Sequence, residues 1–156
     1  MNEVSSLNNF EKNGLYGNHQ NKNESDLIVI NEITNINIYQ LVKFKSGSLE
    51  ATSIIIDGQI LPVSQNSVSG NAITRILWSA PNTWLVISSD NNINKKILAS
   101  CSENDFALTD LSHSRIILQI RGEKALNVIK KGSPLNLNEF QKNCCRTSVY
   151  HGITFT

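Results

Sequence analysis

Three residues near the end of the chain have side chains that could bind a metal. Cys144, Cys145 and His151 lie close together in the sequence, and thiolates and imidazoles are ligands that zinc prefers. A closed zinc site needs a full tetrahedral set, however, and adjacent cysteines in a strand point to opposite faces. The sequence therefore favours ordinary thiols here and predicts no metal-binding residue.

A second group has the residue types of a nucleophilic catalyst. Asp110, Ser112 and His113 lie almost next to one another, whereas a serine–histidine–aspartate relay requires the histidine to be held between the other two side chains. Such close neighbours cannot adopt that geometry. We interpret the segment as a polar turn in which Asp110 and Ser112 hydrogen-bond to nearby backbone, and we predict no catalytic residue.

The glycines do not form a nucleotide-binding motif. No G-x-G-x-x-G follows a predicted strand, and in the segment from Gly122 to Gly132 the lysines precede the second glycine, unlike a phosphate-binding loop. The sequence therefore predicts that this chain itself binds no cofactor.

Tryptophan and arginine side chains leave alternatives open. Trp78 and Trp84 flank a predicted turn, where they could anchor a partner or pack in the core, and we favour the core. Three arginines lie on or beside predicted strands, where pairing with a surface carboxylate is the common role: Arg115, Arg121 and Arg146. The roles of Cys144, Cys145 and Arg146 stay open.

The clearest structural unit that would position these residues runs from Asp110 to Phe140. Residues 114–121 alternate as a half-buried strand, Gly122 interrupts it, and a helix of about two to three turns follows from Glu123. The predicted helix ends at Gly132, with Pro134 beyond it. Its apolar stripe consists of Ala125, Leu126, Val128 and Ile129.

The other elements complete an α+β pattern with a mixed or antiparallel sheet and a few packed helices. Alternation predicts strands over 27–32, 36–44, 72–78 and 83–89, and helical spacing predicts a helix over 92–102. A strand over 106–111 is expected to form a hairpin with 114–121, and strands over 145–150 and 153–155 close the chain. Residues 48–61 fit either a helix starting at 48 or a strand over 54–56 ending in a turn, and 65–71 is predicted to be a polar loop.

Length and composition limit the organisation and the partners. A chain of 156 residues is expected to form one domain, which we place over 26–156. The polar composition of residues 1–25 suggests a mobile arm. A net charge of +1 with 17% charged residues argues against nucleic-acid binding. No apolar run is long enough for a membrane span, and the start lacks the pattern of a secretory leader, so a cytoplasmic protein is expected. Three cysteines do not suggest a disulfide framework.

Three blocks resemble the gamma subunit of heterotetrameric sarcosine oxidase, and they occur in the order found in that family. The central block is the strand–helix unit, and a tryptophan-rich block precedes it over 75–85. A cysteine–arginine–threonine element at Cys145-Arg146-Thr147 follows it. The matching residues of the central block are Asp110-Leu111-Ser112, Arg115, Gly122, Ala125, Lys131-Gly132, Pro134-Leu135 and Leu137.

This resemblance implies a fold similar to the folate-binding domain of aminomethyltransferases and a non-catalytic structural subunit. The assembly would oxidise sarcosine to glycine and pass the one-carbon unit to tetrahydrofolate. FAD, FMN, NAD and tetrahydrofolate would be bound by the partner subunits, which are the large alpha and beta flavoproteins and a small delta chain. The family continues beyond the position of Thr156 through a strand and a helix, so this version is either short or cut.

Two alternatives come from other classes of protein. One is a stand-alone folate-binding one-carbon protein of the aminomethyltransferase superfamily, acting as an enzyme or in iron–sulfur maintenance. The iron–sulfur branch has a lysine–glycine–cysteine–tyrosine element, whereas Lys131-Gly132 is followed here by Ser133. The other is a generic α+β interaction domain. The segment that carries the catalytic acid in the aminomethyltransferases is absent from this sequence.

Overall fold

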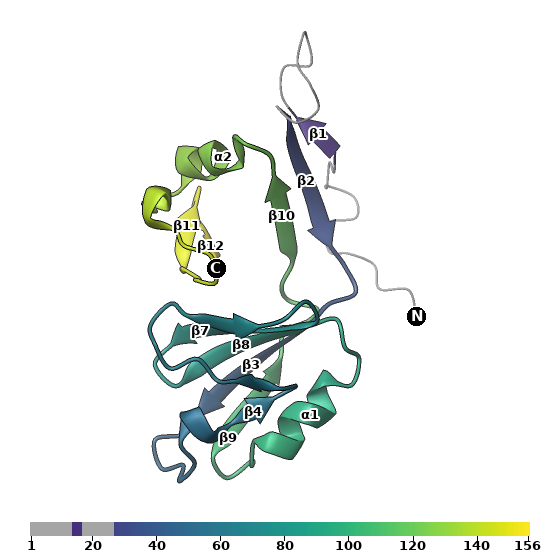
Figure 1. The fold of residues 1–156 in the computed structure, drawn as a ribbon, viewed down its shortest axis with the longest axis vertical. Coiled ribbons are helices and arrows are strands. Elements are labelled where there is room, and N and C mark those ends of the chain that lie inside the picture. The colour runs from purple at the N-terminus through teal and green to yellow at the C-terminus, as the bar shows by residue number, and fades with distance from the viewer. Residues whose placement is uncertain (1–13, 17–26) are drawn as a thin grey trace. The chain divides into compact units, whose positions relative to one another are not determined.

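A computed structural model describes residues 14–16 and 27–156, which divide into two compact units. The described part of the first unit comprises residues 14–16, 27–35, 116–140 and 148–155, and the second comprises 36–115, 141–147 and 156. Figure 1 traces both along the chain.

The second unit contains a five-stranded antiparallel sheet in the order β6-β7-β8-β3-β9. Strands β7 and β8 form a hairpin in which Trp78 lies opposite Trp84, and Asn82 at the turn has a positive φ of 57°. Asparagine tolerates this left-handed conformation better than most residues. The strands are β3 (Asn37–Lys43), β6 (Val68–Gly70), β7 (Thr74–Ala80), β8 (Thr83–Ser88) and β9 (Phe106–Asp110).

Helix α1 (Ile93–Ser100) and a short excursion complete the core of the second unit. The excursion consists of the 3₁₀ turn η2 (Ala51–Ser53) and the paired strands β4 (Ile55–Ile56) and β5 (Gln59–Ile60). Trp84 is buried in this core and its Nε1 donates to the Pro62 carbonyl at 2.7 Å. The other fully buried apolar side chains of the cluster are Leu41, Ile56, Leu61, Ile76, Val86, Ile93 and Ile97.

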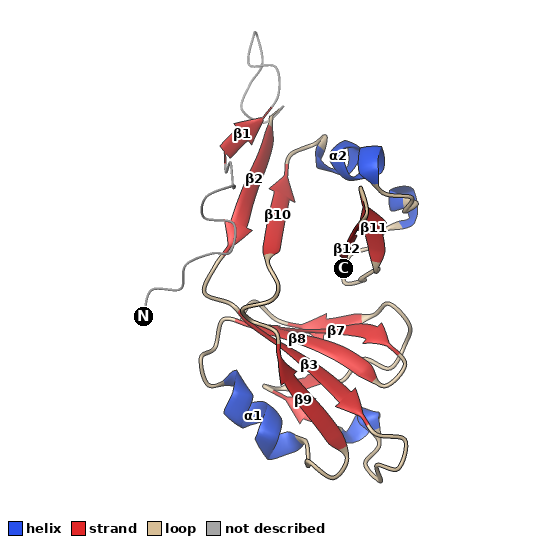
Figure 2. Cartoon of the chain, turned by 180° about the vertical axis from the view of Figure 1, so that it is seen from behind, coloured by secondary structure: helices blue, strands red, loops and turns tan. Residues whose placement is uncertain are grey.

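The first unit is built from smaller pieces, shown with their strands in red and helices in blue in Figure 2. Strands β1 (Gly14–Tyr16), β2 (Ile28–Ile33) and β10 (Ile117–Arg121) form an antiparallel sheet in the order β1-β2-β10. Helix α2 (Ala125–Gly132) and the 3₁₀ turn η3 (Leu137–Glu139) follow β10. Strands β11 (Ser148–Tyr150) and β12 (Ile153–Phe155) form a hairpin, and Tyr150 Oη donates to the Val128 carbonyl of α2 at 3.2 Å.

Most of the predicted elements are present, and the α+β class is confirmed, because the sheets are antiparallel and combined with helices. The strands expected over 27–32, 36–44, 72–78 and 83–89 and the helix over 92–102 appear within a few residues of their predicted bounds. The ambiguous stretch 48–61 contains features of both alternatives, a 3₁₀ turn and then a short strand. Strand β1 falls inside the predicted arm, whose other residues lie outside the described part.

Three local predictions were wrong. Strands β9 and β10 do not pair with each other, because β9 adds to β3 and β10 adds to β2 after the chain leaves the sheet at Ser112. Residues 68–70 form β6 rather than a loop, since they lie alongside β7. The stripe of α2 is only half-buried, and Leu126 is exposed, so this helix is not packed as deeply as its pattern indicates. No helix among the described residues is long and apolar enough to cross a membrane.

Candidate functional site

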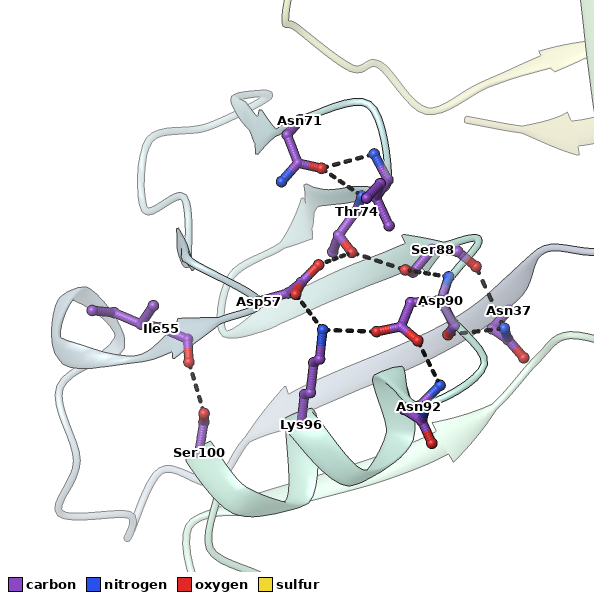
Figure 3. Close-up of polar contacts among 11 residues, drawn as sticks. Asn37, Ile55, Asp57, Asn71, Thr74, Ser88, Asp90, Asn92, Lys96 and Ser100 are labelled. Carbon is purple, nitrogen blue, oxygen red and sulfur yellow. Dashed lines mark hydrogen bonds and ion pairs between the residues drawn. The ribbon is translucent and has the colours of Figure 1, made fainter.

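The densest group of charged side chains in the second unit surrounds Lys96 on α1 (Figure 3). Lys96 Nζ lies 2.5 Å from Asp57 Oδ1 and 2.7 Å from Asp90 Oδ2. Asp57 belongs to the turn between β4 and β5 and has a positive φ of 52°, whereas Asp90 lies between β8 and α1. One ammonium therefore connects the helix to two segments on either side of it.

Buried hydroxyl groups extend this cluster into the sheet (Figure 3). Thr74 Oγ1 donates to Asp57 Oδ2 at 2.5 Å and lies 2.8 Å from Ser88 Oγ. An ionised carboxylate can only accept, so the Thr74 proton points to Asp57 and Ser88 must donate to Thr74. Ser88 Oγ then accepts from the Asp90 amide at 3.0 Å. Every buried hydroxyl in the chain of contacts is satisfied.

The charges in this cluster stabilise one another. Hydrogen bonding to Asp57, and then to Asp90, raises the pKa of Lys96, while the hydrogen bond from Lys96 lowers the pKa of both aspartates. A lysine acts as a nucleophile or base only in its neutral form, which this arrangement disfavours. The geometry is that of a clamp between β4–β5, β7–β8 and α1 rather than of a catalytic amine.

A hollow of about 440 Å³ lies between α1 and β9 in the same unit. Its floor is apolar, and two carboxylates, Glu103 and Asp110, lie among the lining residues together with Asn94 and the phenol of Tyr39. Burial, followed by the charge of Asp110 and a hydrogen bond to it, raises the pKa of Tyr39. No lysine or arginine lines the hollow. Its chemistry suits a group that combines an apolar body with a positive charge.

The Asp110 segment is the polar turn that the sequence predicts. Asp110 Oδ1 accepts from the Ser112 amide at 2.9 Å, and Ser112 Oγ accepts from the Ile38 amide at 3.0 Å. The hydrogen bond from Ser112 lowers the pKa of Asp110. Both side chains therefore hydrogen-bond to nearby backbone, Asp110 is also hydrogen-bonded to the Tyr39 side chain, and His113 is exposed.

The adjacent cysteines diverge, as expected for neighbours in an extended chain. Cys145 is buried and its Sγ donates to the Trp78 carbonyl at 3.1 Å, whereas Cys144 Sγ donates to the Gln141 carbonyl at 2.7 Å. All three cysteines are free thiols, and burial raises the pKa of Cys101 to about 11. Across residues 14–16 and 27–156, no group of three or more histidine, cysteine, aspartate or glutamate side chains could hold a metal ion.

Of the other residues singled out in the sequence, Trp84 is a core residue and Trp78 packs half-buried against the same cluster. Arg115, Arg121 and Arg146 are exposed. Sequence reasoning missed Asp57, Asp90 and Lys96, which are far apart in the chain. The available signal was that Thr74 and Ser88 occupy inward positions of predicted strands, where a buried hydroxyl needs a partner.

Comparison with known proteins supports the predicted fold. The chain matches no protein-family model, and no curated protein matches it. Its fold is similar to a chain of heterotetrameric sarcosine oxidase from Corynebacterium sp. U-96, solved in complex with pyrrole 2-carboxylate. The TM-score is 0.75 with 22% sequence identity, over 83% of this chain and 69% of that chain. The glycine cleavage system aminomethyltransferase T from Bartonella henselae gives a TM-score of 0.49 with 14% identity, over 74% and 34%. The structural resemblance to heterotetrameric sarcosine oxidase predicted from the sequence is thus confirmed.

Proposed function

We propose that this chain is the gamma-type, non-catalytic structural subunit of a heterotetrameric sarcosine oxidase. The observation that carries the proposal is the similarity in fold over 83% of the chain to a chain of such an assembly. The three sequence blocks, which lie in the order found in that family, support the same subunit. The assembly would oxidise sarcosine to glycine and pass the one-carbon unit to tetrahydrofolate.

The chemistry of the described side chains supports a structural role. Lys96 is held between two carboxylates, the Asp110 turn serves its own backbone, and the high pKa of Cys101 disfavours its thiolate. In this proposal FAD, FMN, NAD and tetrahydrofolate are bound by the partner subunits, which are the alpha and beta flavoproteins and the small delta chain. The complex would be cytoplasmic.

Co-expression with the two large flavoprotein subunits and the small delta chain tests the proposal. The expected result is that this chain co-elutes with the flavoproteins in gel filtration and that omitting it lowers the yield or thermal stability of the active oxidase. The role is wrong if the chain elutes alone while the other subunits form a fully active and equally stable enzyme.

Spectra and titration of the isolated chain provide the complementary measurement. We expect a colourless protein after desalting, without a flavin spectrum, and no saturable binding of folinic acid. A flavin spectrum that persists would contradict the proposal. Stoichiometric folinic acid binding would favour a stand-alone folate-binding protein.

A further inference from the structure

The outer edge of β9 offers backbone groups that the described structure leaves unpaired. The Phe44 amide donates to the Asp105 carbonyl and the Leu111 amide donates to the Ile38 carbonyl, both at 2.8 Å. Antiparallel pairing alternates, so these two bonds direct the backbone groups of residues 105, 107, 109 and 111 toward β3. Those of Phe106, Leu108 and Asp110 therefore point away from β3.

Among the described residues, one of these outward groups has a partner within the chain. The Phe106 amide donates to the Ser102 carbonyl at 2.9 Å. Within the described residues, the N–H and C=O of Leu108 have no hydrogen-bond partner, and neither does the Asp110 amide. One residue that presents both groups outward is the unit needed to pair with an added antiparallel strand.

The hollow beside α1 lies along this edge. Leu108 is opposite Leu41 and Asp110 is opposite Tyr39, and all four side chains line the hollow. On the helix side Leu98 lines it too and is 48% exposed. A strand added to β9 would therefore place alternate side chains over an apolar floor, with Leu98 beside them.

The charge of the hollow limits which strand would fit. Glu103 and Asp110 line it without a lysine or arginine, so a basic side chain is complementary and an acidic one is not. A second copy of β9 would bring Asp110 toward these carboxylates and is disfavoured. Strand β9 itself has neither lysine nor proline and pairs with β3 without a bulge, and its one charged residue, Asp110, opposes an acidic added strand but not a basic one.

We propose that the groove between α1 and the outer edge of β9 binds an extended segment of another protein chain by strand addition. The segment would carry apolar residues and a lysine or arginine that lies between Glu103 and Asp110. This inference stands on the geometry of the second unit alone. If the proposed function is right, the segment belongs to a partner subunit.

Titration of the isotopically labelled full chain with two synthetic pentapeptides tests the proposal. Their sequences are valine–threonine–lysine–threonine–valine, in which alternation puts both valines and the lysine on the same face of the strand, and the same peptide with glutamate in place of lysine, both capped at the ends. We expect the lysine peptide to shift the amide signals of Leu98, Leu108 and Asp110 in NMR spectra. It should bind at least about fivefold more tightly than the glutamate peptide, which corresponds to about 1 kcal/mol.

Matched variants separate backbone pairing from side-chain effects. Leu108→Pro removes an outward N–H that makes no internal bond, whereas Leu108→Ala keeps that N–H and removes the side chain. Glu103→Lys reverses a charge in the groove, and Glu50→Lys reverses one on an exposed residue that does not line it. Leu108→Pro and Glu103→Lys should each weaken the lysine peptide at least about fivefold more than their controls.

The inference is overturned if the peptides bind equally, if the shifts lie away from the groove, or if Glu103→Lys binds the lysine peptide as well as Glu50→Lys does. The comparison of Glu103→Lys with Glu50→Lys tests the proposed site even if Leu108→Pro fails to fold. Co-elution with flavoprotein subunits tests a different claim. If the chain co-elutes with the flavoproteins but does not bind the peptides, the proposed function stands and the strand-addition site is wrong. If it binds the peptides but does not co-elute, the site stands and the proposed function is wrong.

Discussion

In the second unit, the charged side chain of Lys96 stabilises the fold and has no catalytic role in our interpretation. Lys96 is 43% exposed at its side chain, yet both of its carboxylate partners are less exposed and are held by other hydrogen bonds. Exposed ion pairs contribute little because the chain must immobilise two side chains to form them. Here Thr74 and Asn92 already fix the aspartates, so less entropy is lost when Lys96 binds.

Replacing Lys96 by methionine should therefore lower the free energy of unfolding at neutral pH, and by clearly more than replacing a neighbouring lysine that makes no ion pair. The pKa of Asp57 is held below its usual value of 3.8, mainly by the hydrogen bond from Lys96. A lowered carboxylate pKa contributes stability above the unfolded value, and that stability is lost as the pH falls through the folded value. Urea titrations should show the difference between wild type and variant narrowing below about pH 4.

Lys95→Met is the matched control, because Lys95 neighbours Lys96, is exposed and takes part in no ion pair of the described structure. It should change stability by less than about half a kcal/mol at every pH. Equal losses in the two variants, or a Lys96 effect that persists undiminished at pH 3, would show that the clamp does not stabilise the fold.

The thiol of Cys101 provides a second residue-scale prediction. With a pKa of about 11, its reactive thiolate should be scarce at pH 8, and the side chain is also buried. Iodoacetamide should modify the half-buried Cys144 first and Cys101 only on unfolding, as followed by peptide mass spectrometry. Modification of Cys101 in the folded chain as fast as Cys144 would contradict this burial.

At the scale of elements, prediction from sequence succeeded where a segment's own pattern decides its structure. Strands β7 and β8 alternate clearly on both sides of Pro81 and Asn82, so local turn chemistry fixes their pairing. The pairing of β9 and β10 could not be predicted in this way. Their partners, β3 and β2, are distant in sequence, and no local feature says that Ser112 binds the Ile38 amide.

The candidate site was less predictable than the fold for the same reason. The Asp110 turn is local and was correctly interpreted, whereas the clamp joins Asp57, Asp90 and Lys96 through tertiary packing. The outward groups of Leu108 depend on the register between β9 and β3. Alternation can place a residue on a face, but it does not identify which edge of a sheet lacks a neighbour.

Gly122 tests the element that joins β10 to α2. It has a φ of 117°, and a β-carbon there would collide with the Leu27 carbonyl oxygen. Gly122→Ala should cost about 2 kcal/mol or more, because backbone strain and a steric conflict combine. Gly152→Ala is the control, since its φ is 86° but nothing lies within 4 Å of the added carbon. Urea titrations should show a clearly larger loss for Gly122→Ala; equal losses would mean that Leu27 does not lie against this glycine.

At the scale of the whole molecule, the two units differ in how much apolar surface they bury. All members of the core cluster belong to the second unit. In the described part of the first unit, only Leu27 and Leu137 are buried apolar residues, while α2 buries none. Several large apolar side chains of that unit are exposed instead, namely Leu15, Tyr16, Ile116, Leu118, Leu126, Phe140, Val149 and Ile153.

This imbalance predicts that the first unit opens more easily than the second in the isolated chain. Few buried contacts mean a low free energy of local opening, so amides of β10 should exchange with solvent much faster than those of β3 and β8. Hydrogen exchange followed by mass spectrometry measures both in one experiment.

If the exposed apolar residues of the first unit are covered by partner subunits, as the proposed function implies, the protection of β10 should increase at least about tenfold in the co-expressed assembly. The amides of β8, which already lie within a complete core, should change little and serve as the internal reference. Equal protection of β10 and β8 in the free chain would show that the first unit is stable by itself, whereas unchanged protection of β10 in the assembly would show that its partners bind elsewhere.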